Sequence, residues 1–181
     1  PFGLIISKWW RGIDIRRYGS GNIGATNVLR TLGVKPAVLV LIGDTGKGIL
    51  AVMLGRVAMG GVWAPVLCGL AVILGHNWPI TLKFSGGKGV ATTLGVLLGM
   101  LPVIALVLVA IWLIILAVTR YVSLASIVSS AILPILILLF SGISPYLLFG
   151  LVACTASIYK HRSNIKRLLT GKEYKIGQRV S

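Results

Sequence analysis

Long apolar stretches separated by short polar turns constrain this chain more than any other feature. They cover residues 36–56, 61–82, 89–118, 122–140 and 143–159. A helix that crosses the hydrocarbon core of a bilayer needs roughly 20 apolar residues. Only 12% of the residues are charged, against about 25% in a typical soluble domain. We therefore predict a single all-α domain over residues 1–181, folded as a polytopic bundle of membrane helices.

Positive charge gathers in three segments between and after the apolar stretches, at residues 8–30, 83–88 and 160–181. The chain has 18 Lys and Arg against three acids, which gives a net charge of +15. The positive-inside rule places such segments in the cytoplasm, so residues 160–181 are predicted to be a basic cytoplasmic tail. In a membrane protein this imbalance favours membrane lipids and small anions as partners, and nucleic acid is not expected.

The helix count follows from placing all three basic segments on one side. An even number of crossings must then separate 83–88 from 160–181, so the stretch 89–118 must hold two helices. Pro102 is the natural break, because proline lacks an N–H and disfavours helix just before it. We interpret the apolar residues 1–7 as the remnant of a first helix that is mostly missing here. The prediction is therefore seven membrane helices.

The piece 89–100 is short for a membrane helix. Its length of about 12 residues spans about 18 Å, whereas the hydrocarbon core is about 30 Å thick. The turn Gly86–Gly89 is therefore predicted to lie within the inner leaflet, where irregular backbone is tolerated only beside a polar cavity or inside protein. Gly95 and Gly99 form a G-x-x-x-G pair, which favours close helix packing.

A glycine-rich segment, Gly19–Asn27, followed by Arg30, is the first candidate site. It contains G-x-G-x-x-G, but a dinucleotide fold needs a preceding apolar strand, and residues 14–18 do not form one. Two interpretations stay open. Backbone N–H groups and the guanidinium can bind an anion, or the glycines and asparagines can simply shape a juxtamembrane turn. The residues predicted to contact phosphate here are Ser20, Gly21, Asn22, Thr26, Asn27 and Arg30.

The segment Ser85–Thr93 is the second candidate site. A P-loop has Ser or Thr directly after its lysine, whereas Gly89 follows Lys88 here. Even so, glycines, a projecting lysine and a following helix N-terminus favour a bound phosphate. The predicted contacts are Gly86, Gly87, Lys88 and Gly89, and the alternative is a lysine that snorkels at a helix start.

The third candidate site lies at the end of the last apolar stretch. If helix continues there, His161 and Asn164 share one face, three residues apart, and both are predicted to be site residues. Arg162, Lys166 and Arg167 are interpreted instead as a polybasic stop that binds anionic lipid.

Two groups inside the apolar stretches are assigned structural roles. Asp44 and Lys47 are predicted to form an ion pair, because charges in a membrane helix need partners. His76 is predicted to be a structural histidine. Two histidines and two cysteines so far apart do not make a zinc site, and three acids are too few for metal-dependent or Ser/His/Asp chemistry. No metal and no cofactor are predicted.

Taken together, these segments resemble the bacterial acyl-phosphate:glycerol-3-phosphate acyltransferase family of the PlsY type. The segments that carry the resemblance are Ser20–Asn27 with Arg30, Gly86–Thr92 and His161–Ile165, supported by Asp44-x-x-Lys47-Gly48 and Gly75-His76-Asn77. The resemblance covers essentially the whole chain.

The resemblance implies a multi-pass enzyme of the bacterial inner membrane, with its active site facing the cytoplasm. It would transfer a fatty acyl group from acyl phosphate, supplied by a partner enzyme, to the 1-hydroxyl of glycerol-3-phosphate. The products would be lysophosphatidic acid and inorganic phosphate. The resemblance gives phosphate-holding roles to Ser20, Arg30 and Lys88, a weaker one to Ser123, and catalytic roles to Ser20, Lys88, His161 and Asn164.

Acyl phosphate is already activated, so such an enzyme needs charge neutralisation and alignment rather than a covalent nucleophile. We expect direct attack in a ternary complex, with His161 or the substrate's own phosphate as the base. A transporter of organic phosphates and a non-catalytic lipid-binding scaffold are the alternatives. The sequence has no internal repeat or midplane site to favour a transporter, and a scaffold does not explain two glycine-rich turns.

Overall fold

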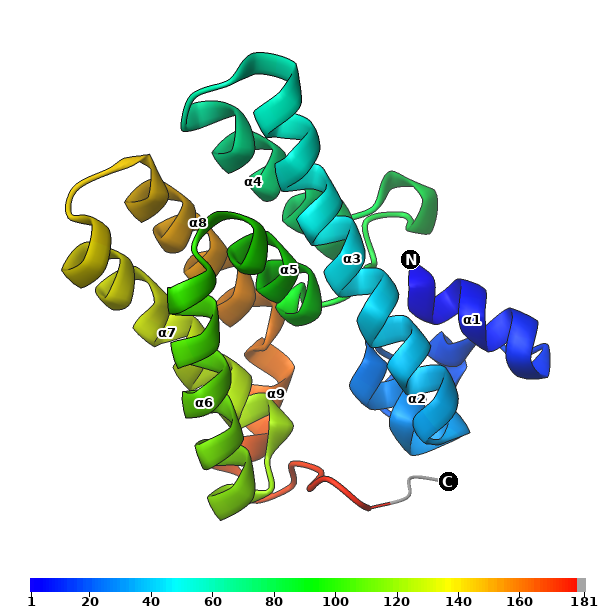
Figure 1. The fold of residues 1–181 in the computed structure, drawn as a ribbon. Helices are drawn as coiled ribbons and strands as arrows, with labels where there is room; N and C mark the ends of the chain where they lie inside the picture. The colour runs from blue at the N-terminus through cyan, green and yellow to red at the C-terminus, as the bar shows by residue number, and fades with distance from the viewer. Residues whose placement is uncertain (179–181) are drawn as a thin grey trace.

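The computed structural model describes residues 1–178, and within that range all regular structure is helical (Figure 1). The helices in chain order are α1 (Phe2–Arg11), η1 (Ile15–Arg17), α2 (Ala25–Leu32), α3 (Val34–Met59), α4 (Trp63–Asn77), η2 (Ile80–Leu82), α5 (Val90–Met100), α6 (Pro102–Thr119), α7 (Val122–Ser141), α8 (Pro145–Lys160) and α9 (Arg162–Leu169).

Four segments are long and apolar enough to cross a membrane. They are Val34–Ala58, Trp63–Leu82, Pro102–Thr119 and Val122–Ser141. Large apolar side chains such as Val57, Val118 and Leu139 are exposed on these helices, as lipid-facing positions require. The prediction of a polytopic membrane bundle is therefore confirmed.

Helix boundaries follow the local chemistry of the chain. The apolar stretch 89–118 divides as predicted, since α5 ends at Met100 and α6 begins at Pro102. The stretch 61–82 is less regular than predicted, because α4 ends at Asn77 and a separate 3-10 turn covers Ile80–Leu82. Pro79, which has no N–H to donate, stands between these two pieces.

The short helix α5 packs closely against α3. A methyl group added at Gly95 would collide with the backbone of Thr45, and one added at Gly99 would press on the Val52 side chain. Both neighbours belong to α3, so the prediction that this glycine pair serves helix packing is confirmed. The main core then continues through buried Val96 and Phe149 toward α4 and α8.

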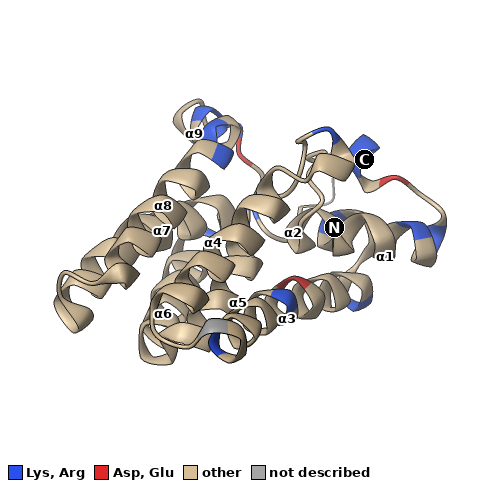
Figure 2. Ribbon diagram, turned by 90° about the horizontal axis from the view of Figure 1, so that it is seen from above, with Lys and Arg blue, Asp and Glu red and all other residues tan. Residues whose placement is uncertain are grey.

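The polar segments gather toward one end of the bundle. In Figure 1, α2, α9 and the α6–α7 turn lie at the end opposite the α3–α4 and α7–α8 connections. In Figure 2, most Lys and Arg lie on α1, on α9 and on the loops near them, while the bodies of α4 to α8 are almost free of charge. Within the described residues, the basic segments that include α1 and α9 therefore lie toward the same end of the bundle.

Candidate active site

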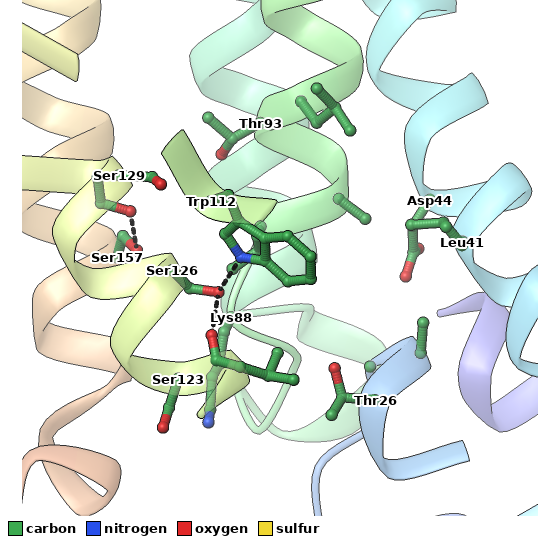
Figure 3. A pocket seen from close by; sticks show the side chains of 18 of the residues that line it. Thr26, Leu41, Asp44, Lys88, Thr93, Trp112, Ser123, Ser126, Ser129 and Ser157 are labelled. Atoms are coloured by element: carbon green, nitrogen blue, oxygen red, sulfur yellow. Dashed lines mark hydrogen bonds between the residues drawn. The ribbon is translucent and has the colours of Figure 1, made fainter. Parts of the chain in front are cut away.

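A cavity of about 510 Å³ opens between α2, α3, α5, α6, α7 and the start of α9. Its side chains are apolar along most of its length, and Figure 3 shows Trp112, Leu41 and the hydroxyls of α7 around it. At one end it becomes polar, and this end is lined by Ser20, Thr26, Arg30, Lys88, Ser123, His161, Asn164 and Glu173. The three segments singled out in the sequence therefore meet at one place.

The first glycine-rich segment is shaped from within by Asn27. Its buried side chain accepts a hydrogen bond from Ser20 N at 2.8 Å and donates to the carbonyls of Tyr18 and Asn22 at 3.0 and 2.8 Å. The Asn22 side chain in turn accepts a bond from Gly24 N at 2.8 Å. Asn27 thus holds the loop in shape.

Three backbone amides of this segment already have hydrogen-bond partners within the loop. The N–H groups of Ser20 and Gly24 donate to the asparagine side chains, and Gly21 N donates to the Tyr18 carbonyl at 3.0 Å. These three amides are therefore engaged inside the loop. Ser20, Asn22 and Thr26 of this loop line the cavity.

The amides of the second glycine-rich turn are also engaged. Gly86 N donates to the Asn77 carbonyl at 3.3 Å, and Gly87 N donates to the His76 carbonyl at 3.1 Å. The N–H groups of Gly86 and Gly87 are therefore not free to donate to a phosphate, because carbonyls at the end of α4 accept them. The turn presents the ammonium of Lys88 to the cavity, as Figure 3 shows.

Lys88 lies in a network of polar side chains that joins distant parts of the chain. Its ammonium donates to Asn164 Oδ1. Asn164 Nδ2 donates to Glu173 Oε1 at 2.7 Å, and the Ser123 hydroxyl donates to the same oxygen at 2.9 Å. Arg167 Nε donates to Glu173 Oε2 at 2.7 Å. Ser123 therefore both lines the cavity and holds Glu173.

Glu173 is the residue that sequence reasoning missed. The sequence analysis assigns it no role, yet its side chain is buried and accepts hydrogen bonds from Ser123, Asn164 and Arg167. The available signal was that Glu173 is the single acid in a strongly basic segment. A carboxylate in such surroundings serves as the counter-ion of the nearby cations.

Residues 170–178 of the predicted basic tail pack against the helical bundle. Ile176 N donates to the Arg120 carbonyl at 2.8 Å, and Arg30 donates to the Tyr174 carbonyl at 3.2 Å. The segment therefore runs back from α9 across the α6–α7 turn and α2, where it covers the polar end of the cavity. Glu173 reaches the cavity because of this path.

Two titratable groups at the polar end have shifted pKa values. Burial, reinforced by Lys88, lowers the pKa of His161 to about 4, against an opposing hydrogen bond with Ser157. Burial likewise lowers the pKa of Lys88 to about 8, with Glu173 opposing the shift and nearby cations adding to it. His161 is therefore neutral at pH 7, and its Nδ1–H donates to the Ser157 carbonyl at 2.8 Å. Nε2 is left as the acceptor of the ring.

A second, smaller pocket of about 220 Å³ adjoins the first. Ser20, Asn22 and Lys88 line both. The other cations of the second pocket are Lys160, Arg162 and Arg167. Both arginines of the segment interpreted as a lipid-binding stop, Arg162 and Arg167, therefore line a pocket of the site. Lys166, the third residue of that segment, is exposed on α9.

The polar groups of α3 and α4 lie beside this site. Lys47 and Asp44 form the predicted ion pair. The Lys47 ammonium also lies 2.7 Å from His76 Nδ1. His76 is buried among these groups, in line with its predicted structural role.

Comparison with known proteins fits this geometry. The sequence model of a family described as glycerol-3-phosphate acyltransferase matches residues 1–171. The chain belongs to the glycerol-3-phosphate acyltransferase family. A glycerol-3-phosphate acyltransferase of Thermoanaerobacter sp. (strain X514) is 47% identical over 176 residues, which cover 97% of this chain and 88% of the relative. Glycerol-3-phosphate acyltransferase 2 of Moorella thermoacetica is 50% identical, with 99% and 92% covered.

The glycerol-3-phosphate acyltransferase family also includes solved structures of the same fold. The crystal structure of PlsY (YgiH), an integral membrane glycerol 3-phosphate acyltransferase, in its glycerol 3-phosphate form has a TM-score of 0.92 and 42% identity, and the match covers 97% of this chain and 88% of that one. The lysophosphatidic acid form of the same enzyme gives a TM-score of 0.89. The resemblance inferred from the three sequence segments is confirmed.

Proposed function

We propose that this chain transfers a fatty acyl group from acyl phosphate to the 1-hydroxyl of glycerol-3-phosphate, giving lysophosphatidic acid and inorganic phosphate. The observation that carries the proposal is the cavity of about 510 Å³ that is apolar along its length and cationic at one end. A fatty acyl chain with an anionic head matches such a cavity in shape and charge. Family membership supports glycerol-3-phosphate as the acceptor.

The two adjoining pockets suggest how the substrates divide. Acyl phosphate would occupy the larger cavity, with its chain among Leu41, Leu97 and Leu108. Glycerol-3-phosphate, which has no apolar part, would occupy the smaller pocket beside Arg162 and Arg167. The reaction would then take place at the wall shared by both pockets, where Ser20, Asn22 and Lys88 lie.

The chemistry needs no covalent enzyme intermediate. The 1-hydroxyl oxygen attacks the acyl carbon, the bond from that carbon to the phosphate oxygen breaks, and phosphate leaves with the bonding electrons. Lys88 and Arg30 would neutralise the phosphate charge, a contribution that is largest in a site shielded from water. Ser20 and Asn164 would orient the reacting groups through hydrogen bonds.

The proton of the attacking hydroxyl has two possible acceptors in this scheme. His161 is neutral and offers Nε2, so it can receive a hydrogen bond from the hydroxyl. Its pKa of about 4 makes it a weak base, because proton transfer is most efficient near the operating pH. A phosphate of the substrate, with a second pKa of about 6, is the better proton acceptor. We therefore assign His161 to orientation of the hydroxyl and the substrate phosphate to proton removal.

The membrane topology follows from the same charges. We propose seven membrane helices in the inner membrane of a bacterium, with the polar end of the cavity facing the cytoplasm. The basic segments at that end favour this orientation under the positive-inside rule. Glycerol-3-phosphate is water-soluble and would enter from the cytoplasm. Acyl phosphate would be supplied by a partner enzyme that makes it.

A purified sample would test the proposal directly. The protein in detergent is mixed with glycerol-3-phosphate and with palmitoyl phosphate, palmitoyl-CoA or palmitoyl-acyl carrier protein in separate reactions. We expect lysophosphatidic acid only with palmitoyl phosphate, together with one inorganic phosphate for each molecule formed. Product from the thioester donors alone would overturn the donor assignment. Uptake of glycerol-3-phosphate into proteoliposomes without acylation would favour a transporter instead.

A further inference from the structure

The end of α4 packs against the turn that carries Lys88. The amides of Gly86 and Gly87 donate to the carbonyls of Asn77 and His76 at 3.3 and 3.1 Å. The Cα of Gly87 lies directly against the His76 ring, and the three atoms nearest to a methyl group placed there all belong to that ring. The His76 ring therefore limits how closely Gly87 can approach the end of α4.

His76 is itself held from a different helix. The Lys47 ammonium of α3 lies 2.7 Å from His76 Nδ1, and the same ammonium pairs with Asp44. Because an ammonium only donates, Nδ1 must be the acceptor and the ring proton must sit on Nε2. Nε2 is the ring atom nearest to Gly87. The Asp44–Lys47 pair thus orients the ring through Nδ1, and the opposite edge of the ring contacts Gly87.

The Asp44–Lys47 ion pair does not need His76 as a third partner. Asp44 and Lys47 are three residues apart on one helix and can compensate each other without a third group. Placing a histidine between the pair and the turn links α3 to the residue before Lys88. Asp44 and His76 also line the larger cavity, as does Lys88.

We propose that His76 is a positioning residue for Lys88: its ring, oriented by Lys47, supports Gly87 and so sets where the Lys88 ammonium lies at the wall between the two pockets. The proposal rests on the function proposed above, in which Lys88 holds phosphate. His76 does not touch a substrate in this scheme. It acts through the Gly86–Gly89 turn.

A set of paired substitutions tests the contact. Gly87→Ala places a methyl group against the His76 ring. Gly86→Ala places one against the backbone carbonyls of His76 and Asn77 and the Pro79 ring, and no His76 side-chain atom is among its three nearest neighbours. His76→Asn keeps an acceptor for Lys47 but removes the ring atoms next to Gly87. The variants are Gly86→Ala, Gly87→Ala and His76→Asn, with the two doubles that combine His76→Asn with each glycine change.

We expect His76→Asn to restore activity to the Gly87→Ala variant and not to the Gly86→Ala variant. Gly87→Ala and Gly86→Ala should both lower kcat/KM for glycerol-3-phosphate. Adding His76→Asn should raise the Gly87→Ala value at least about tenfold, or about 1.4 kcal/mol of coupling, and should leave Gly86→Ala unimproved. His76→Asn alone should raise KM with kcat nearly unchanged, because it weakens phosphate binding in the ground and transition states alike.

Other results would overturn the proposal. Equal rescue of both glycine variants, rescue of neither, or a Gly87→Ala enzyme with wild-type kinetics would each show that the ring does not set the turn. A fall in kcat of His76→Asn with unchanged KM would indicate a purely structural role, through loss of active protein. Asp44 and Lys47 are left intact throughout, since an unpaired charge in the membrane threatens folding.

A second measurement separates this proposal from the proposed function. The thermal shift that inorganic phosphate produces in the same variants reports on the Lys88 site without turnover. If the wild-type protein makes no lysophosphatidic acid, the proposed function fails. The positioning role is then still decided by whether His76→Asn restores the phosphate shift of Gly87→Ala and not that of Gly86→Ala.

Discussion

Lys88 donates a hydrogen bond to Asn164, which lies 76 positions away in the sequence. The first residue lies in the turn before α5 and the second on α9, so this single bond joins two of the three candidate segments. The Asn164 amide then donates to Glu173. Asn164 is therefore placed to orient Lys88 on one side and Glu173 on the other.

The first prediction concerns this link. Asn164→Ala removes the acceptor of Lys88, and a hydrogen bond to a charged group contributes about 1.5–3 kcal/mol. We expect kcat/KM for glycerol-3-phosphate to fall roughly 10- to 100-fold, measured by steady-state release of phosphate. Lys166→Ala, at an exposed position on the same helix, is the matched control and should leave the kinetics unchanged. Equal losses in both variants would rule out a specific role for Asn164.

The second prediction concerns pH. The pKa of Lys88 lies near 8, so the protonated, phosphate-binding form is present below that pH and is lost as pH rises through it. We expect kcat/KM for glycerol-3-phosphate to decline above about pH 8. Lys88→Arg should retain some activity without this alkaline limb, because arginine stays charged. Persistence of the same limb in Lys88→Arg would assign it to another group.

The third prediction concerns His161, whose pKa of about 4 makes it neutral over the working range. We then expect kcat/KM to fall below about pH 6, because the phosphate of glycerol-3-phosphate becomes protonated there. This fall is the acidic limb of the profile. His161→Gln should lower the rate and keep this limb at the same pH. Its disappearance in His161→Gln would instead identify the histidine as the titrating base. The measurement is a pH–rate profile of both proteins.

The fourth prediction separates two residues of the first glycine-rich segment. Asn27→Ala removes the side chain that holds the loop through bonds to Ser20, Tyr18 and Asn22, so it should lower both the thermal midpoint and the activity. Ser20→Ala should lower activity with little change in the midpoint, because Ser20 lines both pockets and the amide that bonds to Asn27 is retained. Thermal unfolding in detergent beside steady-state kinetics distinguishes the two patterns.

The fifth prediction tests the apolar part of the cavity. Ala105 lies on its wall and is fully buried. Ala105→Phe should obstruct the path of a long acyl chain, and so should lower kcat/KM for palmitoyl phosphate more than for octanoyl phosphate. Ala117→Phe, at an exposed position on the same helix, serves as the control. Equal effects on both donors would argue against an acyl chain in this cavity.

Much of the fold could be predicted from local sequence. The membrane stretches follow from length and hydropathy, the division at Pro102 follows from the missing N–H, and the Asp44–Lys47 pair follows from helical spacing. Each of these depends on neighbours within a few residues. The three polar segments were recognised for the same reason, because glycines, lysines and histidines of this kind stand out against an apolar background.

The site itself depended on helix packing. Local sequence does not reveal that the amides of Gly86 and Gly87 are taken by the end of α4, or that Asn27 serves its own loop. The burial of Glu173 requires residues 170–178 to fold back over α2 and the α6–α7 turn. The sequence alone therefore determined that the chain is a membrane bundle with cationic, glycine-rich segments. Tertiary structure decided which donors remain free for a ligand, because hydrogen bonds between residues far apart in the chain form only once the helices are packed.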